Sequence, residues 1–192
     1  MLDFVLALLI LIILHELGHY FAAKAVGCGV EVVSLGFGKP ILFSKQIGTT
    51  VYQVTPWLLG GYCKLEGELE YSTNPHAFAN LPYRDKLIIS CAGCYINILV
   101  GMLGVIFALV FRNYFLYLLG YLGLCLGIGN MIPFIPALDG SYLWMFALEK
   151  FYGKKRALEI IKKLVFWGMI FLMSLNIACI PYLIKLIQSR AL

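Results

Sequence analysis

The stretch "LILIILHELGHYF", residues 9–21, places two histidines and a glutamate directly after an unbroken aliphatic run. Burying ionisable side chains away from water is costly, and within a membrane span such residues mark functional sites by default. His15, Glu16 and His19 therefore pose two alternatives. They form either a catalytic metal site inside a membrane helix or a polar helix end that carries two hydrogen-bonded imidazoles.

The composition of the whole chain favours a membrane protein. Of its 192 residues 61% are hydrophobic and only 13% are charged, whereas a soluble domain is about half apolar and about a quarter charged. The formal net charge of +5 does not indicate a nucleic-acid partner, because the Lys and Arg residues lie between apolar runs rather than on one polar face. We therefore expect an α-helical integral membrane protein in a lipid bilayer, with no nucleic-acid partner.

Four apolar segments are long enough to cross a hydrocarbon core, which takes about 20 residues. They cover about residues 4–23, 87–111, 114–135 and 164–184. We expect them to form a single multi-pass domain over residues 1–192 of a cell-membrane protein. The basic, periodic stretch 153–164 between the last two segments indicates an interfacial helix.

The positive-inside rule orients these four spans. Alternating topology collects twelve of the 15 Lys and Arg residues on one side. They are Lys24, Lys39, Lys45, Lys64, Arg84, Lys86, Lys150, Lys154, Lys155, Arg156, Lys162 and Lys163. This side is predicted to be cytoplasmic, with both termini outside. His15 then lies past the membrane midplane, towards the cytoplasm.

Residues 30–62, between the first two spans, are predicted to be β-rich. "VEVVSLGFGKPILF" and "TTVYQVTPWLLGGY" are rich in β-branched and aromatic residues and contain turn-forming glycines and prolines. The region is apolar for a loop, so we expect a β-hairpin or small sheet associated with the membrane. Non-helical backbone at that depth must be buried in protein or line a wet cavity.

His15-Glu16-Leu17-Gly18-His19 forms an H-E-x-x-H pattern. On a helix, positions i and i+4 share a face, so both imidazoles can bind one Zn²⁺ ion. Glu16 is then placed to accept a proton from a water whose pKa the metal lowers from about 15.7 towards about 7. The pattern therefore predicts a zinc site with Glu16 as the catalytic base.

A catalytic zinc ion normally takes three protein ligands, so a third must come from elsewhere. Asp139 follows the proline-broken end of the third span, on the side that the charge distribution brings close to His15 and His19. Its alternative role is a turn aspartate in "LDGS". His76 lies in a polar loop and is predicted to be a surface residue.

Three further polar residues lie within or beside the predicted spans. Asn130 can hydrogen-bond a substrate carbonyl or a freed backbone group, or make an ordinary helix contact. Asn97 is predicted to form an interhelical hydrogen bond. Cys94 is predicted to be a packing residue.

These motifs together resemble the site-2 protease family of intramembrane zinc metalloproteases. "HELGHYFAAKAVGCGVEVVSLGFG" is similar to the family's first catalytic segment, and "WLLGGYCKLEGE" to its P-L-G-G-Y-V-K-M motif. "CAGCYIN" resembles A-G-P-x-x-N, and "NMIPFIPALDG" resembles N-x-x-P…L-D-G. The resemblance implies His15, His19 and Asp139 as zinc ligands, Glu16 as the base, and a substrate-binding role for Asn130.

This chain departs from the family pattern at three positions. Cys94 replaces the proline of A-G-P-x-x-N, and Ser141 replaces a glycine that often follows L-D-G. Asn130 and Asp139 are nine residues apart, where the family usually has eight. We expect a minimal core without a PDZ or CBS domain.

The expected function is zinc-dependent cleavage of transmembrane segments in single-span membrane proteins. Two other classes remain: a membrane metal transporter or sensor, and a catalytically silent relative that binds membrane partners. The absence of charges from the second and third predicted spans disfavours a transporter, and an intact Glu16 disfavours a silent relative. The sequence predicts no oligomeric state.

Overall fold

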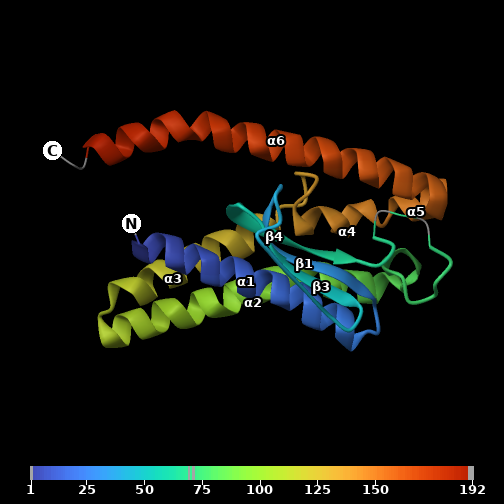
Figure 1. Cartoon of the computed structure of the whole chain (residues 1–192), viewed down its shortest axis with the longest axis horizontal. Helices are drawn as coiled ribbons and strands as arrows, with labels where there is room; N and C mark the ends of the chain where they lie inside the picture. Colours follow the sequence, from blue (N-terminus) through green and yellow to red (C-terminus); the bar gives the residue numbers. More distant parts are fainter. Residues whose placement is uncertain (1, 69, 71, 190–192) are drawn as a thin grey trace.

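The computed structural model describes the backbone of residues 2–68, 70 and 72–189, and their side chains except at residues 59, 173 and 175–189. It is mostly helical with one small sheet (Figure 1). Helices α1 (Leu2–Ala25) and α2 (Tyr83–Phe111) are long and apolar enough to cross a membrane. A third apolar helix, α3 (Tyr114–Asn130), packs against both of them.

The inward face of α1 is a single stripe at helical spacing. Its buried residues are Ala7, Leu11, Ile12, His15, Gly18, His19 and Ala23. Because side chains three and four residues apart share one side of a helix, the aliphatic part of the stripe continues directly into the two histidines. Helix packing therefore turns both imidazoles towards the protein interior.

Small residues bring α2 and α3 into close contact. A Cβ added at Gly104 would lie 2.7 Å from the Cα of Gly120, and one added at Gly101 would lie 2.6 Å from the backbone nitrogen of Leu124. Membrane helices associate through such small-residue faces, because lipid provides no hydrophobic driving force between helices. The glycines thus fix the distance between the two helices.

The β-rich region predicted between the first two spans is confirmed and extends to Leu65. It contains β1 (Val30–Phe37), β2 (Phe43–Ile47), β3 (Thr50–Val54) and β4 (Trp57–Leu65), in the order β2-β3-β1-β4. The β1–β3 pair is parallel, and the other two pairs are antiparallel. Strands β2 and β4 are therefore the edges of the sheet, and β4 packs along α1.

The helix of the third predicted span, α3, ends at Asn130, where the proline-broken end of that span begins. Pro133 and Pro136 follow closely, lack backbone N–H donors and disfavour helical geometry at the residues before them. Irregular backbone leads into a 3-10 turn, η2 (Asp139–Ser141), and two short helices, α4 (Tyr142–Met145) and α5 (Leu148–Tyr152).

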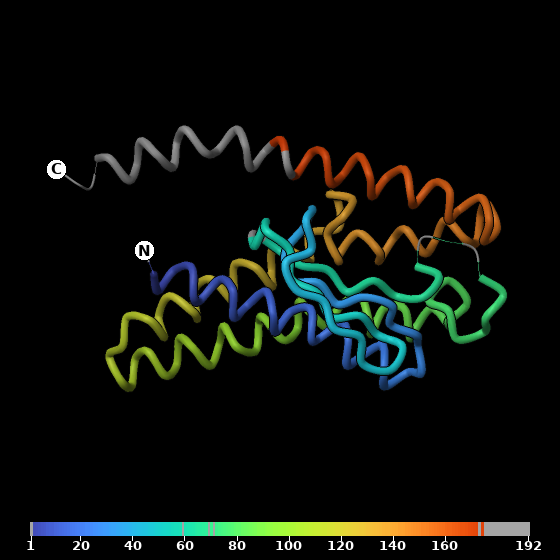
Figure 2. The backbone as a smooth tube through the Cα atoms, in the orientation of Figure 1, coloured from blue at the N-terminus to red at the C-terminus, as the bar shows by residue number. Residues whose placement is uncertain are grey.

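The last helix, α6 (Lys154–Ser189), combines two segments that the sequence separates. The predicted interfacial helix and the predicted span 164–184 belong to one continuous helix. The part of α6 before residue 173 runs along one side of the molecule (Figure 2). The side chains from 175 onwards lie outside the described residues. Gly168 touches the backbone of Pro136, so the first half of α6 packs on the segment that follows α3.

Lys86, which directly precedes the second predicted span, is buried in the structure. It lies in the first turn of α2, is 2% exposed, and its Nζ is 2.6 Å from Oε1 of Glu149 on α5. The ammonium also lies 5.3 Å from the ring centroid of Phe146. The apolar stem of Lys86 and its single carboxylate partner account for this burial.

Replacing Lys86 by methionine is expected to lower the free energy of unfolding by about 3 kcal/mol, because the Glu149 carboxylate loses its cation. Unfolding of the purified protein in detergent micelles measures the loss. Lys64→Met is the matched control: Lys64 pairs with Glu31, but both side chains are exposed, so its cost should stay below about 1 kcal/mol. Equal losses in both variants would contradict the structural role of the buried pair.

Candidate metal centre

Three of the predicted site residues meet at one point. His15 and His19 project from the inward face of α1, and Asp139 begins the η2 turn. Oδ2 of Asp139 lies 3.0 Å from Nε2 of His15 and 3.4 Å from Nε2 of His19, and the two Nε2 atoms are 3.1 Å apart. These three side chains could hold a metal ion.

The donor set and its spacing fit the Zn²⁺ ion expected from the sequence. Ligands bound tetrahedrally to zinc at about 2.0–2.2 Å lie roughly 3.3–3.6 Å from one another. The three observed separations, 3.0–3.4 Å, are close to that value. Two imidazoles and one carboxylate are also a usual ligand set for a catalytic zinc ion, which keeps a fourth position for water.

Helix α2 provides a hydrogen-bond partner for the far side of each imidazole. Nδ1 of His19 donates to the carbonyl oxygen of Ile89 at 2.8 Å, and Nδ1 of His15 lies 3.3 Å from the Asn97 amide. An imidazole that binds metal through Nε2 carries its proton on Nδ1 and needs an acceptor there. The amide of Asn97 can present its oxygen to His15, since the two ends of an amide have the same shape.

Replacing Asn97 by leucine is expected to weaken zinc binding about 10- to 100-fold, because outer partners of metal-binding histidines contribute that much to affinity. Competition with a chromogenic chelator measures the affinity of the purified protein. Asn97→Asp keeps an acceptor for the Nδ1 proton of His15 and should retain most of the affinity. If both variants bind zinc like the unchanged protein, Asn97 has no such role.

Glycines allow the metal-site helices to approach one another closely. A Cβ added at Gly93 of α2 would contact Nε2 of His19 and would lie 2.8 Å from Cε1 of His15. A Cβ added at Gly18 of α1 would lie 2.9 Å from the carbonyl oxygen of Ala92. The imidazoles therefore rest directly on the α2 backbone, in the space that a side chain at position 93 would occupy.

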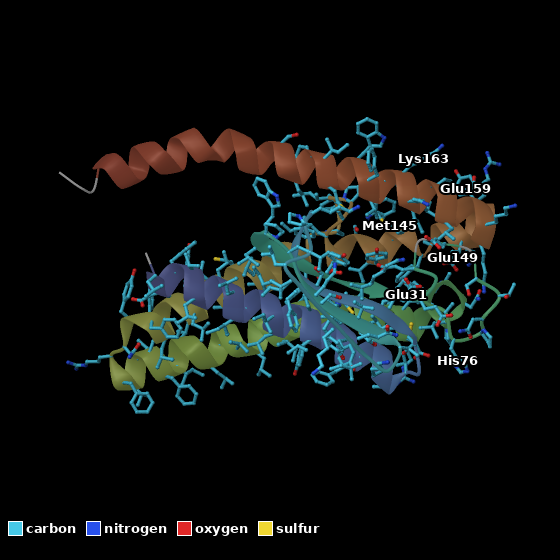
Figure 3. The ribbon with its side chains drawn as sticks, in the orientation of Figure 1. Glu31, His76, Met145, Glu149, Glu159 and Lys163 are labelled. Carbon is cyan, nitrogen blue, oxygen red and sulfur yellow. The ribbon has the colours of Figure 1, made fainter. Side chains whose placement is uncertain are left out.

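Two of the places where this chain departs from the family pattern lie near the metal site, and both place a polar group in contact with a predicted ligand. Nδ2 of Asn130 lies 3.3 Å from Nε2 of His15, so the nine-residue spacing to Asp139 does not remove Asn130 from the site. Cys94, which replaces the family's proline, donates its thiol to Oδ2 of Asp139 at 3.3 Å. His76 is exposed, as predicted, and lies beside Gly27, just past the end of α1 (Figure 3).

Glu16 lies between the two histidines in sequence and next to β4 in space. A Cβ added at Gly61 of β4 would lie 3.1 Å from the Cγ of Glu16 and 2.7 Å from the carbonyl oxygen of Ser34. Gly61 therefore allows the edge strand to pass between β1 and α1. The Glu16 side chain is brought to the face of α1 that β4 covers.

The charge of Asp139 suits a metal ligand. Burial alone would raise the pKa of this carboxyl, but the adjacent imidazoles of His19 and His15 hold its pKa well below the usual range. The carboxylate is therefore ionised near neutral pH, as a ligand must be.

The interhelical hydrogen bond predicted for Asn97 is confirmed, but its partner His15 and the contact of Gly93 with the imidazoles were not predicted. A usable signal was present: Ser90, Gly93, Asn97, Gly101 and Gly104 recur every three or four residues on an otherwise apolar helix. That spacing marks one small and polar face. Which helix this face contacts depends on the tertiary arrangement.

Comparisons with known proteins indicate a peptidase family. A family model described as "Peptidase family M50" matches residues 3–114 and 111–175. Among curated proteins, the chain is 40% identical to one from Neisseria meningitidis over 109 residues, which is 54% of this chain and 24% of that protein. It is 36% identical to one from Campylobacter jejuni over 138 residues, which is 67% of this chain and 34% of that protein.

A relative from Borreliella burgdorferi is 40% identical over 113 residues, which is 54% of this chain and 26% of that protein. The names of all three relatives begin "Putative zinc metalloprotease". The matched region thus spans between about a quarter and a third of their lengths. Since the family model covers most of the sequence, the chain belongs to peptidase family M50, the site-2 protease family that its motifs resemble.

Proposed function

We propose that this protein is an intramembrane zinc metalloendopeptidase that cleaves transmembrane segments of single-span membrane proteins. The observation that carries the proposal is the meeting of His15, His19 and Asp139 donor atoms at zinc-ligand spacing, on a helix apolar enough to span a membrane. The membership of the chain in family M50 and the names of its relatives support the same reading. Regulated proteolysis within the bilayer is the corresponding biological activity.

Each polar residue of the site has a role in this reaction. His15, His19 and Asp139 hold the zinc ion, which supplies Lewis-acid activation of a water molecule and of the scissile carbonyl. Glu16 accepts a proton from the attacking water and passes it to the departing amine. Asn130 donates a hydrogen bond to a substrate carbonyl oxygen beside the metal ligands, because its amide lies next to His15.

The free edge of β4 provides a surface for an extended substrate. A transmembrane helix keeps its peptide groups in internal hydrogen bonds, so the substrate unwinds locally before cleavage. An unwound segment can pair with β4 by strand addition, next to Glu16 at Gly61. The sheet lies against the bundle, where such backbone is protected from lipid.

The proposed topology is a single domain with four spans, in α1, α2, α3 and the second part of α6. Both termini lie outside, and the site faces the cytoplasmic side. The distribution of Lys and Arg supports this orientation. Alone, the 17 residues of α3 can cross only a thin or locally deformed hydrocarbon layer. The irregular segment with two prolines that follows α3 completes the crossing.

Purified protein in proteoliposomes tests this function against its rivals. We expect one zinc ion per chain and cleavage of a model single-span substrate that stops when a chelator is added and resumes with zinc. Zinc flux across the vesicle membrane without cleavage would favour a transporter. Stable substrate binding without cleavage in the zinc-loaded protein would favour a silent relative.

A further inference from the structure

A partly buried carboxylate outside the metal ligand set is joined to the segment that carries Asp139. Oε1 of Glu68, in the turn after β4, accepts a hydrogen bond from the Tyr142 hydroxyl at 2.9 Å. Resting on the proposed function, we propose that Glu68 is a positioning residue for the zinc site. It acts through Tyr142 to hold Asp139 at the metal-binding position.

The Glu68 end of this connection is fixed to the sheet. The Leu65 backbone N–H donates to Oε2 of Glu68 at 3.3 Å, and the Glu68 N–H donates to the Leu65 carbonyl at 3.2 Å. Leu65 is the last residue of β4 and belongs to the buried core. The carboxylate therefore has a defined place relative to the strand that lies beside Glu16.

The Tyr142 end is fixed to the metal ligand. The Tyr142 backbone N–H caps the η2 turn by donating to the carbonyl oxygens of Asp139 and Gly140. The Tyr142 ring packs on Phe78 and Phe146, with centroids 6.2 and 5.4 Å away. Tyr142 is therefore restrained through its hydroxyl, its ring and its backbone. Because its backbone caps the η2 turn, these restraints also fix the turn in which Asp139 lies.

The connection matters because Asp139 follows a segment without regular secondary structure. The residues before it, from Met131 onwards, form no regular helix or strand, and two of them are prolines without N–H donors. A metal ligand on irregular backbone needs outer contacts to keep its geometry. Glu68 and Tyr142 supply such contacts from the sheet, so the β-region and the third zinc ligand are mechanically joined.

Zinc affinity of the purified full chain, measured by chelator competition, tests this role. Tyr142→Phe and Glu68→Leu should each weaken binding about 10-fold, and combining them should weaken it little further, because both remove the same hydrogen bond. Glu68→Gln keeps an oxygen acceptor for Tyr142 and should stay within about 3-fold of the unchanged protein. The absorption spectrum of bound Co²⁺ should change in the first two variants and not in the third.

Lys64→Met is the matched control, since it removes an exposed ion pair between β4 and β1 that does not include the Asp139 segment. Tyr142→Phe is the mildest change, and its thermal unfolding in detergent shows whether it is folded. Unchanged affinity and Co²⁺ spectrum in folded Tyr142→Phe would overturn the positioning role alone. Failure of the unchanged protein to bind zinc would overturn the proposed function together with this inference.

Discussion

Glu16→Gln is expected to leave zinc binding intact and to slow substrate cleavage about 10²- to 10⁴-fold. The amide has the size of the carboxylate but cannot accept a proton from water, and general-base catalysis contributes about 10²–10⁴-fold to such reactions. Glu16 is also not among the three residues whose donor atoms meet. Single-turnover cleavage in detergent or proteoliposomes, with zinc content measured on the same sample, tests both statements.

The matched control is Glu31→Gln, which makes the same chemical change at an exposed position on β1. Figure 3 shows Glu31 on the sheet. This variant should cleave like the unchanged protein. Normal cleavage by Glu16→Gln would remove Glu16 from the mechanism, whereas loss of zinc from that variant would assign it a ligand or folding role instead.

Gly93→Ala is expected to have the second largest effect, on the metal site itself. The added methyl would contact the Nε2 atom of His19 and lie 2.9 Å from Nδ1 of His15, so the imidazoles or the two helices must move. A displacement of about 1 Å at a reacting centre can cost about 10²-fold in rate. We expect a loss of that size in cleavage, together with weakened zinc affinity.

Gly129→Ala provides the matched control, because a Cβ at that position of α3 meets no atom within 4 Å. It should keep normal zinc affinity and normal cleavage. Equal behaviour of the Gly93 and Gly129 variants would mean that α2 does not limit the space of the imidazoles. Thermal unfolding of both variants separates a local effect from general destabilisation.

The parts of the fold that follow local rules were predictable from the sequence. His15 and His19 share a face because they are four residues apart on a helix, and the β-rich region follows from its β-branched residues and glycines. The proximity of Asp139 could also be expected, because charge counts place the end of the third span on the side of the histidines. The first two features depend on short-range geometry. The third depends on the side of the membrane at which each segment ends.

The remaining features depend on how the elements dock. The contact of Gly93 with the imidazoles depends on which face of α2 is turned towards α1. The apolar sequence of α2 does not specify that orientation. The Lys86–Glu149 pair joins residues 63 positions apart, and it is buried because α5 folds back onto α2.

Comparison of membrane-protein fragments between cells with the unchanged protein and cells with Glu16→Gln tests the central claim most directly. Mass spectrometry of newly formed N-termini identifies the cleaved bonds in whichever membrane proteins serve as substrates. We expect termini within apolar segments of about 20 residues that are present with the unchanged protein and absent with the variant. Identical sets of termini in both cells, or differences confined to soluble segments, would contradict intramembrane proteolysis by this site.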